Sequence, residues 1–276
     1  MSVSGTELRN RVQTKAGSSW WMMLVSETKK LTRRKGVMAF TLLGTVGVII
    51  ITFVILEAYH LSNPIKYSPI GGLSGFNKVV LILSQITIIP ASILGTTAGS
   101  QDIESGVIRD MIVTGRSRTS IFLLRIKGAA VVWLIPAIVA YLVGIGVVFA
   151  FAGNTTDPSL HLVIISGIYC AGVSLVYLLT SVGLSALFGS RGPAIAVMIG
   201  WTFIIEAILL NVSALGVVRE VFLTTAIAGL SPVANGSRRL KAAGVTPSVL
   251  VDYLTLIGWP LILCILGWFR SERLEA

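Results

Sequence analysis

The sequence has 276 residues, of which 54% are hydrophobic and only 12% are charged, and its mean hydropathy is +0.86. Soluble globular proteins carry about 25% charged residues, so this composition excludes an ordinary water-soluble domain. The net charge is +10. We assign it to a membrane surface rather than to nucleic acid, because no basic region is interleaved with exposed aromatic residues in a polar domain.

The first 35 residues precede the apolar part of the chain. Residues 1–17 are polar, and from Ser18 to Lys35 apolar residues and cations follow helical spacing. Tryptophan together with basic residues favours a helix that lies in the membrane interface. The alternative is that the first span simply begins with a basic anchor. The apolar stretch Trp20 to Val25 is too short for a cleavable signal.

Six apolar runs are long enough to cross a hydrocarbon core of roughly 30 Å as helices. Their continuity excludes the alternating pattern of a membrane β-barrel. The fold class is therefore all-α, a polytopic membrane protein with a six-span domain at 36–269 and a tail at 270–276. The predicted spans are Gly36–Leu56, Val79–Ala98, Ala129–Phe151, Leu160–Phe188, Ala194–Leu215 and Val251–Phe269.

The distribution of lysine and arginine predicts the orientation. If the N-terminus is cytoplasmic, 16 of these cations lie inside and six lie outside. The positive-inside rule then places both termini and the connection between spans 2 and 3 in the cytoplasm.

That connection is a charged island in an apolar chain, with eight charged residues between Asp102 and Lys127. Ser100 is predicted to cap a short helix that begins near Gln101, with Asp102 and Glu104 in its first turn. Gly115 is predicted to end this helix, and Ser117 to cap the next one. The helix has an apolar stripe and is predicted to dock against another protein; the alternative is a solvated loop with an interfacial helix.

Two further features lie toward the other side of the membrane. Gly216–Leu250 is not fully polar but has no apolar run long enough to cross, and we predict short re-entrant or surface helices there, with an ordinary folded loop as the alternative. Glu206 lies inside the fifth span, where a carboxylate faces a cavity or a partner. It is either a site for a cation or proton or a structural hydrogen-bond anchor.

The chain resembles the membrane (permease) subunits of type-2 ABC exporters. The residues that carry this resemblance are Glu104, Gly106, the apolar stretch Ile108 to Val113, the pair Ser117-Arg118, and Lys127. A proline often precedes the Ser-Arg pair in that family, whereas Gly115 and Arg116 stand there in this chain. The whole arrangement of six spans, with the island after the second, supports the resemblance more than any single residue does.

The resemblance implies that the island is a cytoplasmic coupling helix seated in a cleft of an ABC-type ATPase subunit. The implied ATPase-coupling residues are Asp102, Glu104, Gly106, Arg109, Ser117, Arg118 and Lys127. It also implies export through a pathway formed with a second permease copy or a sister permease, among membrane lipids, and a bacterial cell membrane. ATP and Mg²⁺ would be bound by the partner ATPase.

The sequence lacks a GxxxxGK[ST] phosphate loop, so we expect no ATP hydrolysis by this chain. Because His60 and His161 are isolated and no Ser, His and acid set is suitably arranged, we also expect no metal ligand, catalytic residue or cofactor on it. Cys170 and Cys264 lie inside predicted spans and are expected to be packing residues. A second hypothesis is a proton-linked secondary transporter that uses Glu206, although paired half-helices of an internal repeat are not visible. The third is an intramembrane enzyme, which would need a polar catalytic pair in the bilayer.

Overall fold

The computed structural model describes residues 20–67, 69–106, 117–153, 155–233, 244–245 and 248–273. Within these ranges the regular structure is entirely helical. Six helical segments are long and apolar enough to cross a membrane, as expected of a multi-pass membrane protein. A further helix at residues 20–32 precedes them.

Three of the six spans are built from more than one helix. The first comprises α2 (Lys35–Leu42), the π-helix η1 (Leu43–Gly47) and α3 (Val48–Ser62), and the second comprises α4 (Gly72–Ile86) and α5 (Ile88–Glu104). The third is α7 (Arg118–Ala150), the fourth α8 (Leu160–Phe188), the fifth α9 (Arg191–Gly200) with η2 (Trp201–Ile205) and α10 (Glu206–Leu209), and the sixth α13 (Val249–Arg273).

The predicted spans are present, but several bounds differ. The second span begins at Gly72 rather than at Val79, because a helix continues through polar residues once its apolar part is packed. The fifth span ends at Leu209 rather than at Leu215, where the chain turns into the 3₁₀ helix η3 (Ser213–Val221). The short helix α11 (Leu223–Gly229) follows.

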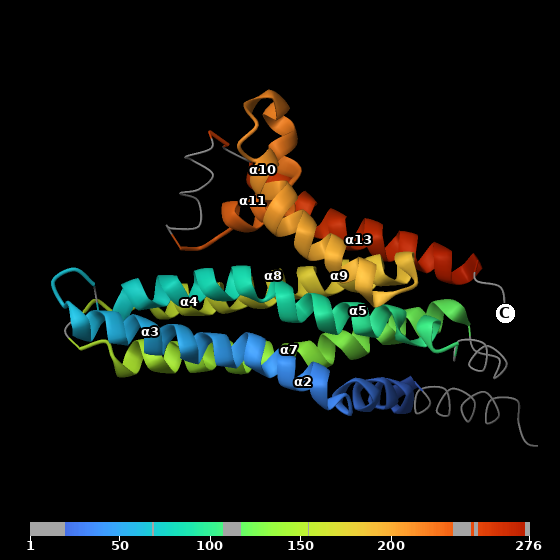
Figure 1. Ribbon diagram of the computed structural model, residues 1–276, viewed down its shortest axis with the longest axis horizontal. Coiled ribbons are helices and arrows are strands. Elements are labelled where there is room, and N and C mark those ends of the chain that lie inside the picture. The colour runs from blue at the N-terminus through green and yellow to red at the C-terminus, as the bar shows by residue number, and fades with distance from the viewer. Residues whose placement is uncertain are drawn as a thin grey trace, which may run out of the picture.

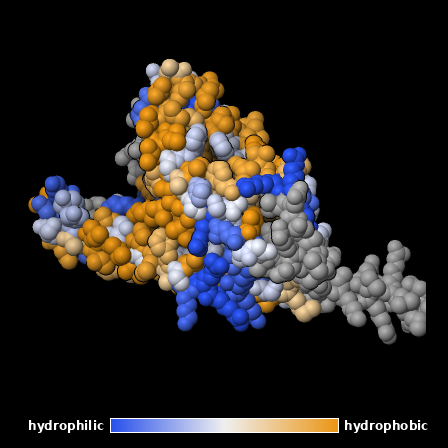
Figure 2. Space-filling model, turned by 45° about the vertical axis from the view of Figure 1, so that its right-hand side comes forward, coloured by the Kyte–Doolittle hydropathy of each residue, from blue (hydrophilic) through white to orange (hydrophobic). Residues whose placement is uncertain are grey.

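The helices alternate in direction, so their ends gather at two ends of the molecule (Figure 1). We call the end that holds residues 20–32, Glu104, Arg118, Arg191 and Arg273 the basal end, and the opposite one the distal end. Toward the distal end, α9–α10 and α13 diverge from α4 and α8 (Figure 1). Figure 2 shows hydrophilic atoms gathered near the basal end and hydrophobic atoms over much of the visible flanks.

The second span is the central one. Of the residues in its most apolar 18-residue stretch, 67% are buried, against 17 to 39% in the corresponding stretches of the other five spans. It packs closely on α8 because Gly95 and Gly99, one turn apart, expose backbone to that helix. A Cβ atom at Gly95 would lie 2.5 Å from the Leu178 carbonyl oxygen, and one at Gly99 would lie 2.4 Å from that of Val182. Small residues at this spacing let membrane helices approach closely.

Candidate functional site at the basal end

Three separate elements meet at the Asp102 carboxylate near the end of α5. Lys30 from the helix at 20–32 donates a hydrogen bond to its Oδ1 atom, and the Arg125 guanidinium of α7 lies 3.0 Å from its Oδ2 atom. The Asp102 and Arg125 side chains are only 2% and 3% exposed. We call Lys30, Asp102 and Arg125 the basal ion cluster. It connects the first helix to the second and third spans, through a buried Asp102–Arg125 pair and a partly buried Lys30.

The Arg125–Asp102 contact is mainly electrostatic. The Arg125 Nη2 and Asp102 Oδ2 atoms are close enough for an ion pair, but their angle is unsuitable for a hydrogen bond. The Arg125 Nε atom has no hydrogen-bond partner in the described part of the chain. Removing one partner of a buried ion pair costs about 3–5 kcal/mol, because the remaining charge is left without compensation. The cluster therefore fixes its three helices more by this penalty than by net attraction.

The helix at 20–32 is seated against α7 by several further contacts. Leu31 is buried in the main hydrophobic core. A Cβ atom at Gly128 would lie 3.0 Å from the Glu27 Cβ atom, so glycine permits the close approach of the two helices there. The Lys127 ammonium lies 4.4 Å from the centre of the Trp20 ring, within the range of a cation–π interaction. Burial raises the pKa of Glu27, beside this interface, above its ordinary value of 4.5.

Glu104, the last residue of α5, connects that helix to the start of the fifth span. Its Oε1 atom accepts hydrogen bonds from the backbone N–H of Arg191 at 2.6 Å and from the Ser100 hydroxyl at 3.1 Å. Arg191 is the first residue of α9, so the carboxylate lies at the positive end of that helix. Glu104 thus fixes the position of α9 relative to α5.

The predicted cap at Ser100 is wrong. The helix does not begin near Gln101; α5 continues through Ser100 to Glu104, and Ser100 is buried and donates to the Thr96 carbonyl oxygen. The apolar end of α5 packs against α8, and this packing outweighs the capping preference of serine. The helix ends at Glu104, and two residues later Gly106 turns the chain away with a φ of 72°, in the left-handed region that glycine adopts without strain.

The predicted cap at Ser117 is confirmed: its hydroxyl oxygen accepts the backbone N–H of Ser120 at 3.3 Å and begins α7. The next residue, Arg118, donates to the Glu272 carbonyl oxygen at 2.5 Å, at the end of α13. A cation is favourable beside the negative end of a helix. Thr119 donates to the Glu272 side chain at 2.9 Å. Arg118 thus takes part in a contact within the chain between the third and sixth spans.

The remaining part of the island lies outside the described residues. This includes Arg109, the predicted stop at Gly115 and the apolar stretch from Val107 to Val113. Both flanks are described, and they are anchored by Asp102 and Glu104 on one side and by Arg118 and Arg125 on the other.

Glu206 is fully buried near the distal end of the fifth span and holds α11 in place. Its carboxylate accepts the backbone N–H groups of Leu223 and Thr224 at 3.2 and 3.0 Å, which are the first two residues of α11. The Thr224 hydroxyl and the Trp201 indole also donate to it, at 2.5 and 2.8 Å. Four donors surround one carboxylate, and this favours the structural anchor over a cation or proton site.

The segment between the fifth and sixth spans has two further anchors. Tyr169 of α8 donates to the Ile227 carbonyl oxygen at 2.7 Å, and Trp259 of α13 donates to that of Val221 at 3.0 Å. Four of the seven residues of α11 are buried. The segment is therefore folded as two short helices, of which α11 is packed against the spans while most of η3 is exposed.

The described residues contain no group of three or more His, Cys, Asp or Glu side chains placed to hold a metal ion. Cys170 is buried, and Cys264 is partly buried and donates to the Leu179 carbonyl oxygen. Among the membrane serines, Ser181 donates to Ser92 at 3.1 Å, between α8 and α5, which is a helix-packing contact.

Lys30, Arg125 and Arg191 form part of this site, although the sequence patterns did not single them out. Their only sequence signal is the presence of cations near the ends of apolar runs, opposite two carboxylates on a neighbouring span. A scan against models of known protein families finds no match, and a search of curated proteins finds none either.

Proposed function

We propose that this chain is the membrane-spanning permease subunit of a type-2 ABC exporter. It would work as a dimer, with a second copy or a sister permease, and would be driven by a separate ABC-type ATPase. In this proposal the basal end is cytoplasmic, the helix at 20–32 lies in the membrane interface, and η3 with α11 forms a re-entrant segment on the outer side. The host would be a bacterium and the site its cell membrane.

The basal ion cluster is the observation that carries the proposal. An ATPase that pushes on residues 107–116 would act on two helix ends, Glu104 of α5 and Arg118 of α7. The buried Asp102–Arg125 pair joins these ends, and Lys30 adds the interfacial helix. Because a buried ion pair resists separation, a displacement of the island would move these helices together.

The basal contacts extend this connection to the other spans. Glu104 binds the start of α9, and Arg118 binds the end of α13. Arg270 of α13 also donates to the Leu187 carbonyl oxygen near the end of α8. A force on the island would therefore reach the second to the sixth spans through direct contacts, as coupling to an external ATPase requires.

The proton-linked alternative depends on Glu206 being free to exchange a proton. This carboxylate accepts hydrogen bonds from four donors, two of which are backbone N–H groups of α11. Protonation would remove a hydrogen bond from at least one of these donors. The geometry therefore gives this alternative no support.

The test is affinity purification of the tagged full chain from its host membranes, followed by ATPase assay in proteoliposomes. We expect an ABC-type ATPase in stoichiometric amount. Arg109→Glu should lower its recovery by about tenfold, which corresponds to roughly 1.4 kcal/mol of lost docking free energy. The matched control is Lys66→Glu, a charge reversal at the distal end, which should leave recovery unchanged. Purification without any ATPase, or equal loss in both variants, would refute the proposal.

A further inference from the structure

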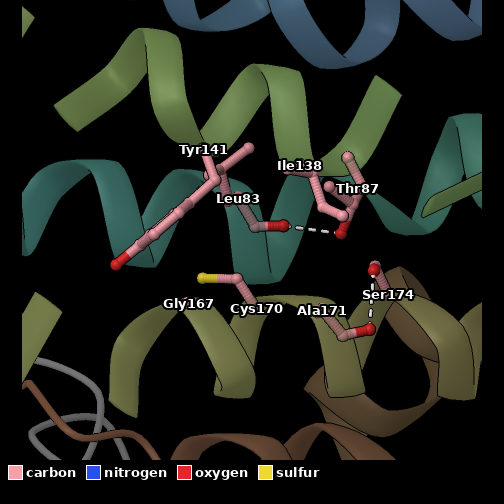
Figure 3. Close-up of a pocket in the computed structure, with 9 residues that line it drawn as sticks. Leu83, Thr87, Ile138, Tyr141, Gly167, Cys170, Ala171 and Ser174 are labelled. Carbon is pink, nitrogen blue, oxygen red and sulfur yellow. Dashed lines mark hydrogen bonds between the residues drawn. The ribbon is translucent and has the colours of Figure 1, made fainter. Parts of the chain in front are cut away.

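A cavity of about 150 Å³ lies inside the bundle, between the junction of α4 and α5, α7 and α8 (Figure 3). Its walls include Leu83 and Thr87 from the second span, Ala137 and Tyr141 from the third, and Ala171 from the fourth. This is roughly the volume of an apolar protein cavity that holds one benzene molecule. It can therefore take about six carbon atoms.

Each side-chain donor of the cavity wall has a backbone acceptor, including the Cys170 thiol, which lies 4.0 Å from the Val80 carbonyl oxygen. The Thr87 hydroxyl donates to the Leu83 carbonyl oxygen at 2.5 Å, and the Ser174 hydroxyl donates to that of Ala171 at 2.9 Å (Figure 3). Tyr141 donates to the Val163 carbonyl oxygen at 2.5 Å. A buried water needs two to four polar partners, whereas these groups offer it only hydroxyl lone pairs in a wall that is otherwise apolar. The wall chemistry thus suits an apolar occupant.

The depth of the cavity agrees with that of lipid chains. Ala137 and Tyr141 lie 13 and 9 residues before Ala150, the distal end of α7. At a rise of 1.5 Å per residue, they lie about 14–20 Å from that end. This is near the middle of a hydrocarbon core of roughly 30 Å.

The cavity is continuous with the apolar flank of the molecule. Its rim residue Ile138 is 49% exposed, and Ile135 and Leu142, on the same side of α7, are 63% and 60% exposed. Ile164 and Ile168 form the corresponding exposed stripe on α8. In a chain that crosses a membrane, such a surface is covered by lipid.

We propose that this cavity binds a segment of about six carbon atoms of one acyl chain of a membrane phospholipid, which enters from the bilayer between α7 and α8. An empty cavity would leave its lining atoms without dispersion contacts, and the surrounding solvent at this depth is hydrocarbon. The bound acyl segment contacts Leu83 and Thr87, where α4 passes into α5. The hydrogen bond from the Thr87 backbone N–H to the Leu83 carbonyl oxygen is long there, at 3.4 Å. The acyl segment therefore fills space beside a weakened helical turn.

The test uses the full chain in lipid nanodiscs that contain a phospholipid with a photoreactive diazirine in the middle of one acyl chain. After illumination, adducts are located by mass spectrometry. We expect them to concentrate in the peptides that carry residues 137–141 and 167–171, above other exposed stretches such as Ile50 to Val54. Even labelling of all exposed stretches would overturn the proposal.

Two variants on neighbouring positions sharpen the test. Ala171→Phe fills the cavity and should lower the adduct yield there by about tenfold, which corresponds to roughly 1.4 kcal/mol. Gly172→Phe is the matched control, because a Cβ atom at Gly172 meets nothing within 4 Å, and it should leave the yield unchanged. Ala137→Phe fills the same space from α7 and should repeat the loss if Ala171→Phe fails to fold. Unchanged yield in the filled variants would overturn the proposal.

Discussion

The Glu206 carboxylate accepts both the backbone N–H and the hydroxyl of Thr224, at 3.0 and 2.5 Å, across 18 residues of sequence. A glutamine at position 206 would turn an NH₂ group toward one side of this set of donors. Each buried donor left unpaired costs about 1–3 kcal/mol. We therefore expect Glu206→Gln to speed hydrogen exchange of the α11 amides by about tenfold to a hundredfold, since each tenfold corresponds to 1.4 kcal/mol.

The control for this prediction is Glu220→Gln, a partly exposed glutamate of η3 in the same segment. It should leave the exchange of α11 unchanged. If Glu206→Gln preserves the protection of α11 but abolishes gradient-driven transport, the anchor reading is wrong and the proton-linked one is favoured.

The Asp102–Arg125 pair gives a second prediction. Asp102→Asn leaves the buried Arg125 without its counter-charge and should lower the free energy of unfolding by about 3–5 kcal/mol. The double variant Asp102→Leu with Arg125→Met replaces the pair by apolar side chains and should recover most of that loss. Thermal unfolding in detergent, followed by tryptophan fluorescence, measures both.

The control for this pair is Lys127→Met, because Lys127 is exposed at the basal end. Its effect should be below about 1 kcal/mol, as for an exposed cation–π contact. If the losses of the two single variants at Asp102 and Arg125 simply add in the double variant, the two charges are not coupled.

The six spans could be predicted from sequence because each is a continuous apolar run, and hydropathy alone decides whether such a run can cross a membrane. The fourth span was placed correctly, as Leu160–Phe188, but the ends of several others were not, since tertiary packing extends a helix beyond its apolar part. Ser100 illustrates this: its capping preference is local, but burial against α8 keeps it inside α5.

The basal ion cluster was only half predictable. A carboxylate at Asp102 near the end of a span signals a partner, but Lys30 lies 72 residues away in sequence and no spacing rule connects the two. The partners of Glu206 could not be predicted for the same reason, because the donors on α11 reach this carboxylate only after the chain folds back toward the fifth span. One local signal was overlooked: Gly95 and Gly99 stand four apart, the spacing of a close helix contact.

That spacing gives a third prediction. At Gly99→Ala the new methyl group would lie 2.4 Å from the Val182 carbonyl oxygen, a backbone atom that cannot move without shifting α8. Overpacking of this kind costs about 1–3 kcal/mol. On α8 itself, Gly172→Ala meets open space and should stabilise the helix by about 0.5–1 kcal/mol. Opposite shifts in the unfolding temperature of the two variants are expected; a loss of equal size in both would contradict the close contact.

The fourth prediction concerns the pH dependence of stability near Glu27. Burial raises the pKa of Glu27 above 4.5; the opposing charge of Lys30 lowers it, Asp102 raises it and Arg125 lowers it. Because the folded protein then holds this proton more tightly than the unfolded chain, ionisation of Glu27 reduces stability. The reduction is absent below pH 4.5 and is complete once the pH exceeds the raised pKa.

Glu27→Gln removes this ionisation while keeping a side chain of similar size. The free energy of unfolding of the wild type should therefore fall relative to Glu27→Gln as the pH rises from 4.5 through the raised pKa, and the difference should then stay constant. Unfolding temperatures of both proteins between about pH 4 and 8 measure it, with Glu57→Gln at the distal end as the control. A difference between wild type and Glu27→Gln that is independent of pH would mean that this carboxyl group is not desolvated by the contact with α7.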